Sequence, residues 1–277
     1  MKNAMFLGLA AALATLPAVA WAAGDCPVRP PADLTSPGTL TIATHLTMPP
    51  QAFLDNDKPA GFAIEIGEAI AREMCLKAAF VNFDFAGLFP GLNARKFDTI
   101  IAGIGITPDR QKSLDFVPYF EGGVRLIVRK DSKLTFKSED DLCGLPVATQ
   151  SGSVEAISLE RTNKERCSES KKIDIMAYPN FNEAVQQLRK KVADVAFLDW
   201  PFANYLAQAV PDLALGSPIL SGTPGLPRNK HGIVVRKGDV AMSDALSEGL
   251  KRIEADGTYG KILAKWNVEE GDIRSVK

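Results

Sequence analysis

The sequence FDTIIAGIGITPDRQKSLDFVPYF, residues 97–120, decides the fold class of this chain. Residues 98–102 form a short apolar run rich in β-branched side chains, which predicts a buried strand. The run meets Gly103 and Gly105, where the missing Cβ atoms let a ligand approach the backbone closely. A third glycine at the spacing of a dinucleotide-binding fingerprint is missing, so a nucleotide site is not indicated.

A helix start follows these glycines. Thr107 has the position of an N-cap, Pro108 that of the first helical residue, and Arg110 lies in the first turn. Unpaired amide N–H groups and the positive end of a helix dipole then lie beside a guanidinium group, which favours a carboxylate ligand. An ordinary strand-to-helix turn with a solvated arginine is the alternative interpretation of this stretch.

The first 22 residues have the composition of a secretory signal peptide. Lys2 gives the positive start, residues 4–19 are almost wholly apolar, and Ala20-Trp21-Ala22 is a small-residue cleavage site. A transmembrane anchor is the alternative, but the apolar run is short. An aspartate directly before Cys26 does not suit a lipoprotein signal. We therefore expect a soluble, exported, periplasmic protein whose mature chain begins near Ala23.

Composition excludes several classes of function. The chain is 46% hydrophobic and 23% charged, as in an ordinary globular protein, and its formal net charge of −1 gives no reason to expect a nucleic-acid partner. A metal site is not expected, because the sequence has no C-x-x-C pair and its histidines are His45 and His231. We expect no cofactor.

Four cysteines follow the predicted cleavage site, namely Cys26, Cys75, Cys143 and Cys167. An even number in an exported chain suggests two disulfides, and four cysteines allow three pairings. We favour Cys26–Cys75 with Cys143–Cys167, which places one bridge in each half of the chain.

Strand and helix patterns alternate along the rest of the chain. Strands are predicted at 40–44, 79–83, 124–128, 145–149, 173–177, 192–198 and 232–235, and helices at 62–74, 87–94, from 154, from an N-cap at Asn182, at 245–253 and at 259–266. This order predicts two α/β units with mainly parallel sheets, joined by two strand crossings. Ligands bind outside the carboxyl ends of such strands, where His45, Phe85 and Asp199 fall.

Five motifs extend the pattern over nearly the whole mature chain. They are GFAIEIGEAIA (61–71), FAGLFPGLNARKFDTIIAGIGITPDR (85–110), DLCGLPVATQSGS (141–153), VADVAFLD (192–199) and ADGTYGKILAKW (255–266). In order and spacing the chain resembles a type II periplasmic solute-binding protein of the polar amino-acid family. The pair Cys143 and Cys167 also resembles a bridge seen in one branch of that family.

The resemblance implies a two-lobed α/β fold with mainly parallel sheets and two hinge strands. Lobe 1 would comprise residues 39–121 and 232–277, and lobe 2 residues 122–231 with the hinge crossings. Residues 23–38 would form an N-terminal extension.

The resemblance also implies a set of ligand-binding residues. Arg110 would hold the α-carboxylate of an amino acid, with further N–H donors from Gly103 and Gly105. Asp199 would hold the α-ammonium group from the other lobe. A zwitterion removed from water needs one fixed cation and one fixed anion, because a single buried charge is costly.

Further contacts are implied around these two charges. The turn that contains Gln150, Ser153 and Val154 would support the carboxylate end, and Phe85 would pack on the ligand. His45 and Met48 would line the side-chain half of the pocket.

This sequence departs from the family pattern at several of these positions. Gly105 stands where members usually carry serine or threonine. His45, Met48 and Gln51 stand where an acidic residue and aromatics are usual. The identity of the ligand therefore does not follow from the resemblance.

The implied function is to capture a small zwitterion, such as an amino acid or a derivative, by ligand-induced lobe closure around it. The binding protein would be a monomer and would deliver the ligand to an ABC permease in the inner membrane. An accessory or sensory binding protein for a small organic acid would share the cleft. A dehydratase-like enzyme on the same fold is the third hypothesis; the sequence has no G-x-S-x-G motif.

Overall fold

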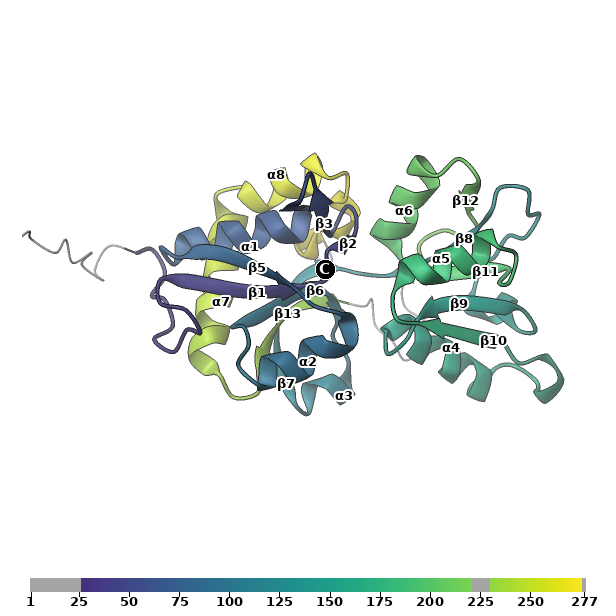
Figure 1. Ribbon diagram of the computed structural model, residues 1–277, viewed down its shortest axis with the longest axis horizontal. Helices are drawn as coiled ribbons and strands as arrows, with labels where there is room; N and C mark the ends of the chain where they lie inside the picture. Colours follow the sequence, from purple (N-terminus) through teal and green to yellow (C-terminus); the bar gives the residue numbers. More distant parts are fainter. Residues whose placement is uncertain (1–25, 221–229, 276–277) are drawn as a thin grey trace, which may run out of the picture.

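Two five-stranded sheets divide the chain into two lobes (Figure 1). The computed structural model describes residues 26–220 and 230–275. Each sheet is flanked by helices, so the predicted two-lobed α/β fold is confirmed. The signal peptide predicted for residues 1–22 lies outside the described residues.

The sheet of lobe 1 has the strand order β5-β1-β6-β13-β7. These strands are β5 (Lys77–Asn82), β1 (Thr39–Thr44), β6 (Thr99–Gly105), β13 (Lys230–Arg236) and β7 (Leu114–Glu121). β1 pairs in parallel with β5 and β6, while β13 runs antiparallel to β6 and β7. All but β13 therefore point the same way, as the mainly parallel prediction requires.

The sheet of lobe 2 repeats this plan with the order β10-β9-β11-β8-β12. Its strands are β10 (Asp174–Tyr178), β9 (Pro146–Gln150), β11 (Val195–Asp199), β8 (Val124–Arg129) and β12 (Leu213–Leu215). β9 is parallel to β10 and β11, and β8 is antiparallel to β11 and β12. β8 is the one strand of this sheet that points the other way.

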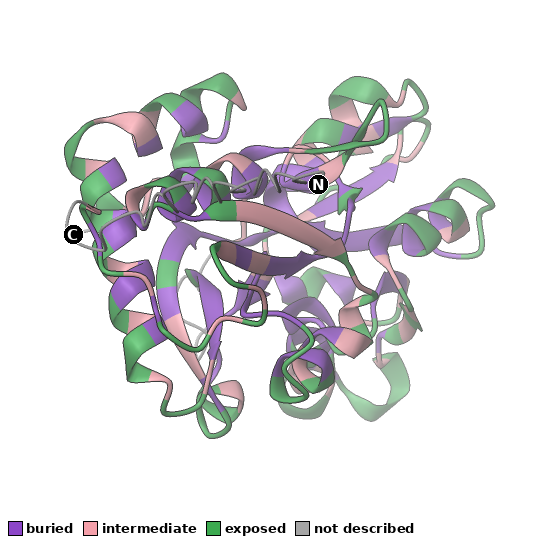
Figure 2. Cartoon of the chain, turned by 60° about the vertical axis from the view of Figure 1, so that its left-hand side comes forward, coloured by how far each residue is buried: buried purple, intermediate pink, exposed green. Residues whose placement is uncertain are grey.

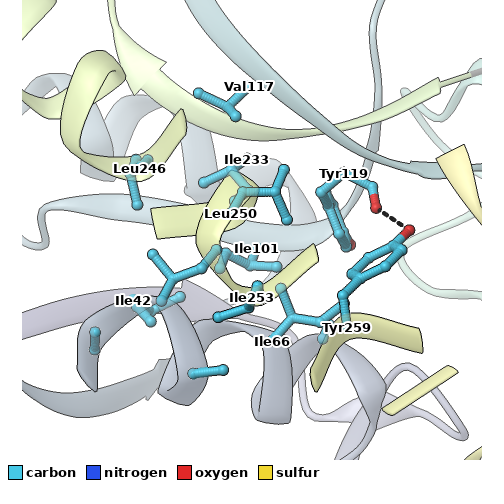
Figure 3. Packing of buried hydrophobic residues seen from close by; sticks show 14 of the residues in the cluster. Ile42, Ile66, Ile101, Val117, Tyr119, Ile233, Leu246, Leu250, Ile253 and Tyr259 are labelled. Atoms are coloured by element: carbon cyan, nitrogen blue, oxygen red, sulfur yellow. Dashed lines mark hydrogen bonds between the residues drawn. The ribbon is translucent and has the colours of Figure 1, made fainter. Parts of the chain in front are cut away.

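Helices α1 (Phe62–Glu73), α7 (Val240–Ala255) and α8 (Thr258–Lys265) share a large apolar cluster with the sheet of lobe 1. Figure 3 shows this packing, in which Ile42 and Ile101 of the sheet meet Ile66, Leu246 and Leu250 of the helices. The hydroxyl of Tyr259 donates a hydrogen bond of 2.8 Å to the carbonyl of Tyr119 there. Helix α2 (Phe85–Asn93) packs in a separate cluster of this lobe.

Lobe 1 also carries several smaller elements. They are the ribbon β2 (Thr47–Met48), β3 (Ala52–Asp55) and β4 (Lys58–Ala60), the short helix α3 (Pro108–Gln111), and the 3₁₀ turns Glu269–Gly271 and Ile273–Ser275. Thr107 caps α3, because its hydroxyl accepts a hydrogen bond from the backbone N–H of Arg110 at 3.2 Å. The helix start predicted from Thr107 and Pro108 is therefore confirmed.

Lobe 2 contains α4 (Val154–Glu165), α5 (Phe181–Arg189), α6 (Trp200–Ala209) and the 3₁₀ turns Glu139–Leu142 and Glu169–Lys171. The prediction that Asn182 caps α5 is wrong. Asn180 is the cap, since its side chain accepts a hydrogen bond of 2.9 Å from the N–H of Glu183. The side chain of Asn182 instead donates to the carbonyl of Thr47 in lobe 1 at 2.9 Å.

Two chain crossings join the lobes. Gly122 and Gly123 separate β7 from β8, and the second crossing leads from β12 to β13. The crossings pair at Val124 and Leu220, whose backbone N–H groups donate to each other's carbonyls at 3.2 and 2.8 Å. The lobe boundaries given above stay a prediction; β13 begins at Lys230, two residues before the boundary predicted at 232.

Both disulfides lie within single lobes. Cys26 is bonded to Cys75 beside the end of α1, and Cys143 is bonded to Cys167 beside the end of α4, as favoured from the sequence. Neither bridge connects the lobes, so neither restrains their relative movement.

Each lobe inserts one large side chain into the apolar packing of the other. Met48 of lobe 1 packs in a cluster of lobe 2 that includes Phe181 and Phe202. Trp200 of lobe 2 packs in the main cluster of lobe 1 and stacks on Phe120 at a centroid distance of 5.7 Å. The lobes are therefore closed on each other.

Burial follows this architecture. Figure 2 shows buried residues along the strands and the inner faces of the helices, and exposed residues on the outer helix faces and loops. Among the described helices, none has the length and apolar content needed to span a membrane.

Candidate ligand-binding cleft

A narrow cleft between the lobes gathers all ten residues predicted to bind the ligand. The predicted residues that line it are His45, Met48, Phe85, Gly103, Gly105, Arg110, Gln150, Ser153, Val154 and Asp199. Ala102, Glu155 and Phe181 complete the lining. The structure thus brings the predicted residues together, while their roles in binding stay predictions.

Arg110 reaches across the cleft from lobe 1. Its Nη1 donates to the carbonyl of Gly105 at 2.7 Å, and its Nη2 donates to the carbonyl of Gly152 in lobe 2 at 3.0 Å. The guanidinium also lies over the rings of Phe85 and Phe89, at 6.0 and 5.4 Å from their centroids. Burial lowers the pKa of Arg110, whereas the nearby carboxylate of Glu155 raises it. The backbone and the two rings fix the direction of this cation, as a carboxylate site requires.

Asp199 ends β11 and faces the cleft from lobe 2. Its side chain is buried, and within the described chain neither carboxylate oxygen accepts a hydrogen bond. Its side chain makes no cap hydrogen bond to α6, in which the second residue, Pro201, has no N–H to donate. Burial, followed by the charge of Glu155, raises the pKa of Asp199 well above its usual range. A carboxylate buried in this way needs a cationic partner in order to be ionised.

The turn after β9 contributes the floor of the cleft in lobe 2. Ser153 caps α4 by accepting a hydrogen bond of 3.2 Å from the N–H of Ala156. The side chain of Gln150 donates to the carbonyl of Pro179 at 3.1 Å, which fixes its amide. With Val154, these residues place the N-terminus of a twelve-residue helix at the cleft. Such a terminus favours an anion.

Apart from Arg110, the side chains of lobe 1 that line the cleft are neutral at pH 7. His45 is buried; its Nε2 lies 2.8 Å from the sulfur of Met48, and its Nδ1 has no hydrogen-bond partner among the described residues. Burial lowers the pKa of His45 to about 4, so the ring is neutral at pH 7. Its ring meets that of Phe85 edge to face at 6.0 Å.

Gly103 and Gln51 are packed against each other behind these side chains. Gly103 has a φ of +65°, and a Cβ at this position would overlap the side-chain amide of Gln51. The amide of Gln51 is buried, and in the described part of the chain neither of its polar atoms is hydrogen-bonded. Glycine is required at position 103 by both its backbone angle and this contact.

Sequence reasoning missed three residues that line the cleft, Ala102, Glu155 and Phe181. Glu155 follows Val154 directly, but the sequence does not say which side of the first helical turn faces the cleft. Phe181 begins α5 and was placed outside that helix by the mistaken cap at Asn182. A helix start at Asn180 would have revealed Phe181.

Asp98 and Asp115 hold the structure of lobe 1 and lie outside the cleft lining. The Asp98 carboxylate accepts hydrogen bonds from the backbone of Thr35 and Thr41 at 2.7 and 2.8 Å. Asp115 accepts from Lys237 and from the N–H of Gly238 at 2.8 and 2.7 Å. Within the described residues there is also no group of three His, Cys, Asp or Glu side chains that could hold a metal ion.

Comparison with known proteins gives concordant results. Residues 40–269 match the family model of bacterial extracellular solute-binding proteins, family 3. ABC transporter arginine-binding protein 1 of Escherichia coli (strain K12) is 30% identical over 234 residues, which cover 82% of this chain and 90% of that protein.

Solved structures agree in fold. An ancestral arginine-binding protein bound to arginine has a TM-score of 0.75 and 34% identity, covering 83% of this chain and 98% of that one. An ancestral amino acid-binding protein, a precursor of cyclohexadienyl dehydratase, has a TM-score of 0.72 and 31% identity, covering 83% and 95%. With the family model matched over both lobes, the chain belongs to the bacterial extracellular solute-binding proteins of family 3.

Proposed function

We propose that this protein binds an amino acid in the inter-lobe cleft and delivers it to an ABC permease of the inner membrane. The observation that carries the proposal is the placement of Arg110 and Asp199, which face one narrow cleft from opposite lobes. A carboxylate on Arg110 and an ammonium group on Asp199 would connect the lobes through the ligand. Binding and closure would then be the same event.

The chemistry of each partner supports this assignment. Arg110 can exchange its hydrogen bond to Gly152 for a ligand carboxylate, which keeps the guanidinium paired across the cleft. Asp199 lacks a hydrogen-bonded partner within the described residues, so an ammonium group would relieve the cost of its burial. The named relative in Escherichia coli is an ABC transporter arginine-binding protein, which supports an amino acid as the ligand class.

The cellular setting belongs to the same proposal. The predicted signal peptide would direct the protein to the periplasm, where it would act as a monomer. The permease would recognise the closed arrangement of the two lobes. N-terminal sequencing of the exported protein should begin near Ala23; retention of Met1 would contradict export by a cleaved signal.

Binding rather than catalysis is the function we propose. One structural relative is a precursor of cyclohexadienyl dehydratase, so an enzyme on this fold is a real competitor. That relative is itself an amino acid-binding protein. Incubation with cyclic acids that a dehydratase would consume should leave them unchanged, and turnover would favour the enzyme.

The test of the proposal is a thermal-shift screen. Protein unfolded, dialysed and refolded to remove ligand is heated with single α-amino acids, with their decarboxylated amines and with their deaminated acids. A ligand at 100 times its Kd should stabilise the protein by about 2.7 kcal/mol. We expect a shift with an α-amino acid and none with either truncated analogue. A response to carboxylates alone would contradict the role of Asp199 and favour an organic-acid receptor.

Delivery to a permease requires a cellular test. Cells that lack the gene should take up less of the labelled ligand. The wild-type gene should restore uptake, and Arg110→Ala should not. Uptake that does not depend on the gene would favour an accessory or sensory binding protein.

A further inference from the structure

The charged side chains that line the cleft do not balance one another. The described lining contains one cation, Arg110 from lobe 1, and two acids, Glu155 and Asp199 from lobe 2. Glu155 is 4% exposed and Asp199 is 3% exposed, so both acids are shielded from water. They come from different elements, the first turn of α4 and the end of β11.

A neutral amino acid would leave this imbalance in place. Its carboxylate would pair with Arg110 and its ammonium group with Asp199. These two pairs would neutralise one of the two acids of the cleft. The second acid, Glu155, would stay buried beside a completed set of charges. A buried charge without an opposite charge is unfavourable in a closed cleft.

Among the described residues, Arg110 is the one cation whose charge lowers the pKa of Glu155. The N-terminus of α4 offers a partial positive charge, and Arg110 would be engaged by the ligand carboxylate. Burial, with a smaller contribution from the negative charge of Glu139, raises the pKa of Glu155 to about 6, whereas its own backbone N–H, the hydroxyl of Ser153 and the charge of Arg110 lower it. Arg166 is paired with Glu139 at 3.3 Å and with Asp140 at 2.9 Å.

We propose that the cleft selects an amino acid with a net positive charge, whose side-chain cation pairs with Glu155. This inference rests on the proposed amino-acid-binding function and names the class of ligand. With such a ligand, two acids of the cleft meet two cations of the ligand, and Arg110 meets the carboxylate. The rings of Phe85 and Phe181, which also line the cleft, suit the methylene stem and the cation of a basic side chain.

The decisive experiment compares ligands of the same shape and different charge. Isothermal titration calorimetry of the refolded wild-type protein at pH 7.5 measures the Kd of arginine and of citrulline, its neutral isostere. We expect arginine to bind at least about tenfold more tightly than citrulline. Citrulline would lose one charged hydrogen bond to Glu155, and such a bond contributes enough free energy to change the Kd by about this factor. Equal affinities, or tighter binding of citrulline, would overturn the inference without any variant.

The Glu155→Gln variant tests whether Glu155 causes the preference for arginine over citrulline. The ratio of the two affinities should fall by about tenfold in this variant, since the charge on the ligand loses its partner. Glu160→Gln is the matched control, because Glu160 is an exposed acid on the same helix. It should keep the wild-type ratio. An unchanged ratio in a folded Glu155→Gln variant would refute the role of Glu155.

The outcomes separate this inference from the proposed function. Failure of every α-amino acid to bind would reject the proposed function itself. Binding of neutral amino acids at least as tight as that of arginine would reject the selectivity alone. In the second case, calorimetry in buffers of different ionisation enthalpy would show proton uptake if Glu155 were neutralised by a proton instead.

Discussion

The Nε2 atom of His231 lies 3.6 Å from Oδ1 of Asp199, and both side chains are buried. His231 belongs to β13, the strand by which the chain returns to lobe 1, and Asp199 belongs to lobe 2. Burial, assisted by the charge of Arg110, lowers the pKa of His231 to about 3. The imidazole is therefore neutral at pH 7 and does not balance a charge on Asp199. This carboxylate is kept available for a cation that enters the cleft.

The Asp199→Asn substitution should raise the stability of the ligand-free protein and lower its affinity for the ligand. Burial raises the pKa of Asp199, so the folded protein holds this proton more tightly and loses stability as the pH rises above the unfolded pKa. The amide cannot ionise, so the variant should melt at a higher temperature than ligand-free wild type at pH 7.5. Its affinity for the amino acid should fall, because the ammonium group loses its anion. Calorimetry and thermal unfolding measure the two effects.

Asp115→Asn provides the contrast for this experiment. Asp115 is paired with Lys237 and Gly238, and these hydrogen bonds lower its pKa. The variant should melt at a lower temperature and bind the ligand as wild type does. A lower melting temperature for Asp199→Asn, with affinity unchanged, would contradict our assignment of Asp199.

Arg110→Ala should weaken ligand binding by about 2–5 kcal/mol, because it leaves a carboxylate unpaired in a closed cleft. Lys112→Ala is the control: it removes the same charge two residues away, from a side chain that is 76% exposed. That variant should bind normally. Near-normal affinity of Arg110→Ala in a calorimetric titration would exclude Arg110 as the carboxylate site.

Because of His45, the stability of the folded protein should decrease as the pH falls. Its pKa falls from 6.5 to about 4 in the folded state, so between these values the unfolded chain takes up the proton first. This contribution to stability is complete above pH 6.5 and is lost as the pH falls toward 4. His45→Gln should therefore show a shallower loss of stability over this range in urea unfolding. Parallel curves for the two proteins would mean that His45 is solvated or charged.

The disulfide of lobe 2 should stabilise the fold without affecting closure. Its cysteines are 24 residues apart, and a loop of this size predicts a loss of about 3 kcal/mol when Cys143 and Cys167 are both replaced by serine. Affinity for the ligand should stay within about threefold, since the bridge lies within one lobe. Thiol titration of the unreduced protein provides a check, and four reactive thiols would show that the bridges are absent.

The parts of this structure that depend on local sequence were predictable. The strand before Gly103, the cap at Thr107 and the position of Arg110 follow from backbone preferences of neighbouring residues. Asp199 fell at the end of a strand, where α/β folds bind ligands. These rules apply within one element and do not need the other lobe.

Features that depend on the meeting of the lobes were not predictable from the pattern. The sequence does not show that Met48 packs in the apolar cluster of lobe 2, nor that Asn182 reaches the carbonyl of Thr47. The direction of Glu155 depends on how α4 is rotated against the cleft. The cap of α5 is different, because Glu183 follows Asn180 by three residues, as in a capping box, and this local signal favours Asn180 over Asn182.

The position of Trp200 gives this protein a built-in optical probe. Its indole N–H donates to the carbonyl of Glu121 at 3.1 Å and its ring stacks on Phe120, so its environment is supplied by lobe 1. Separation of the lobes would transfer the indole from an aromatic stack to water. Intrinsic fluorescence would therefore report domain movement in real time, and the rate of ligand-induced closure could be followed without attaching a dye.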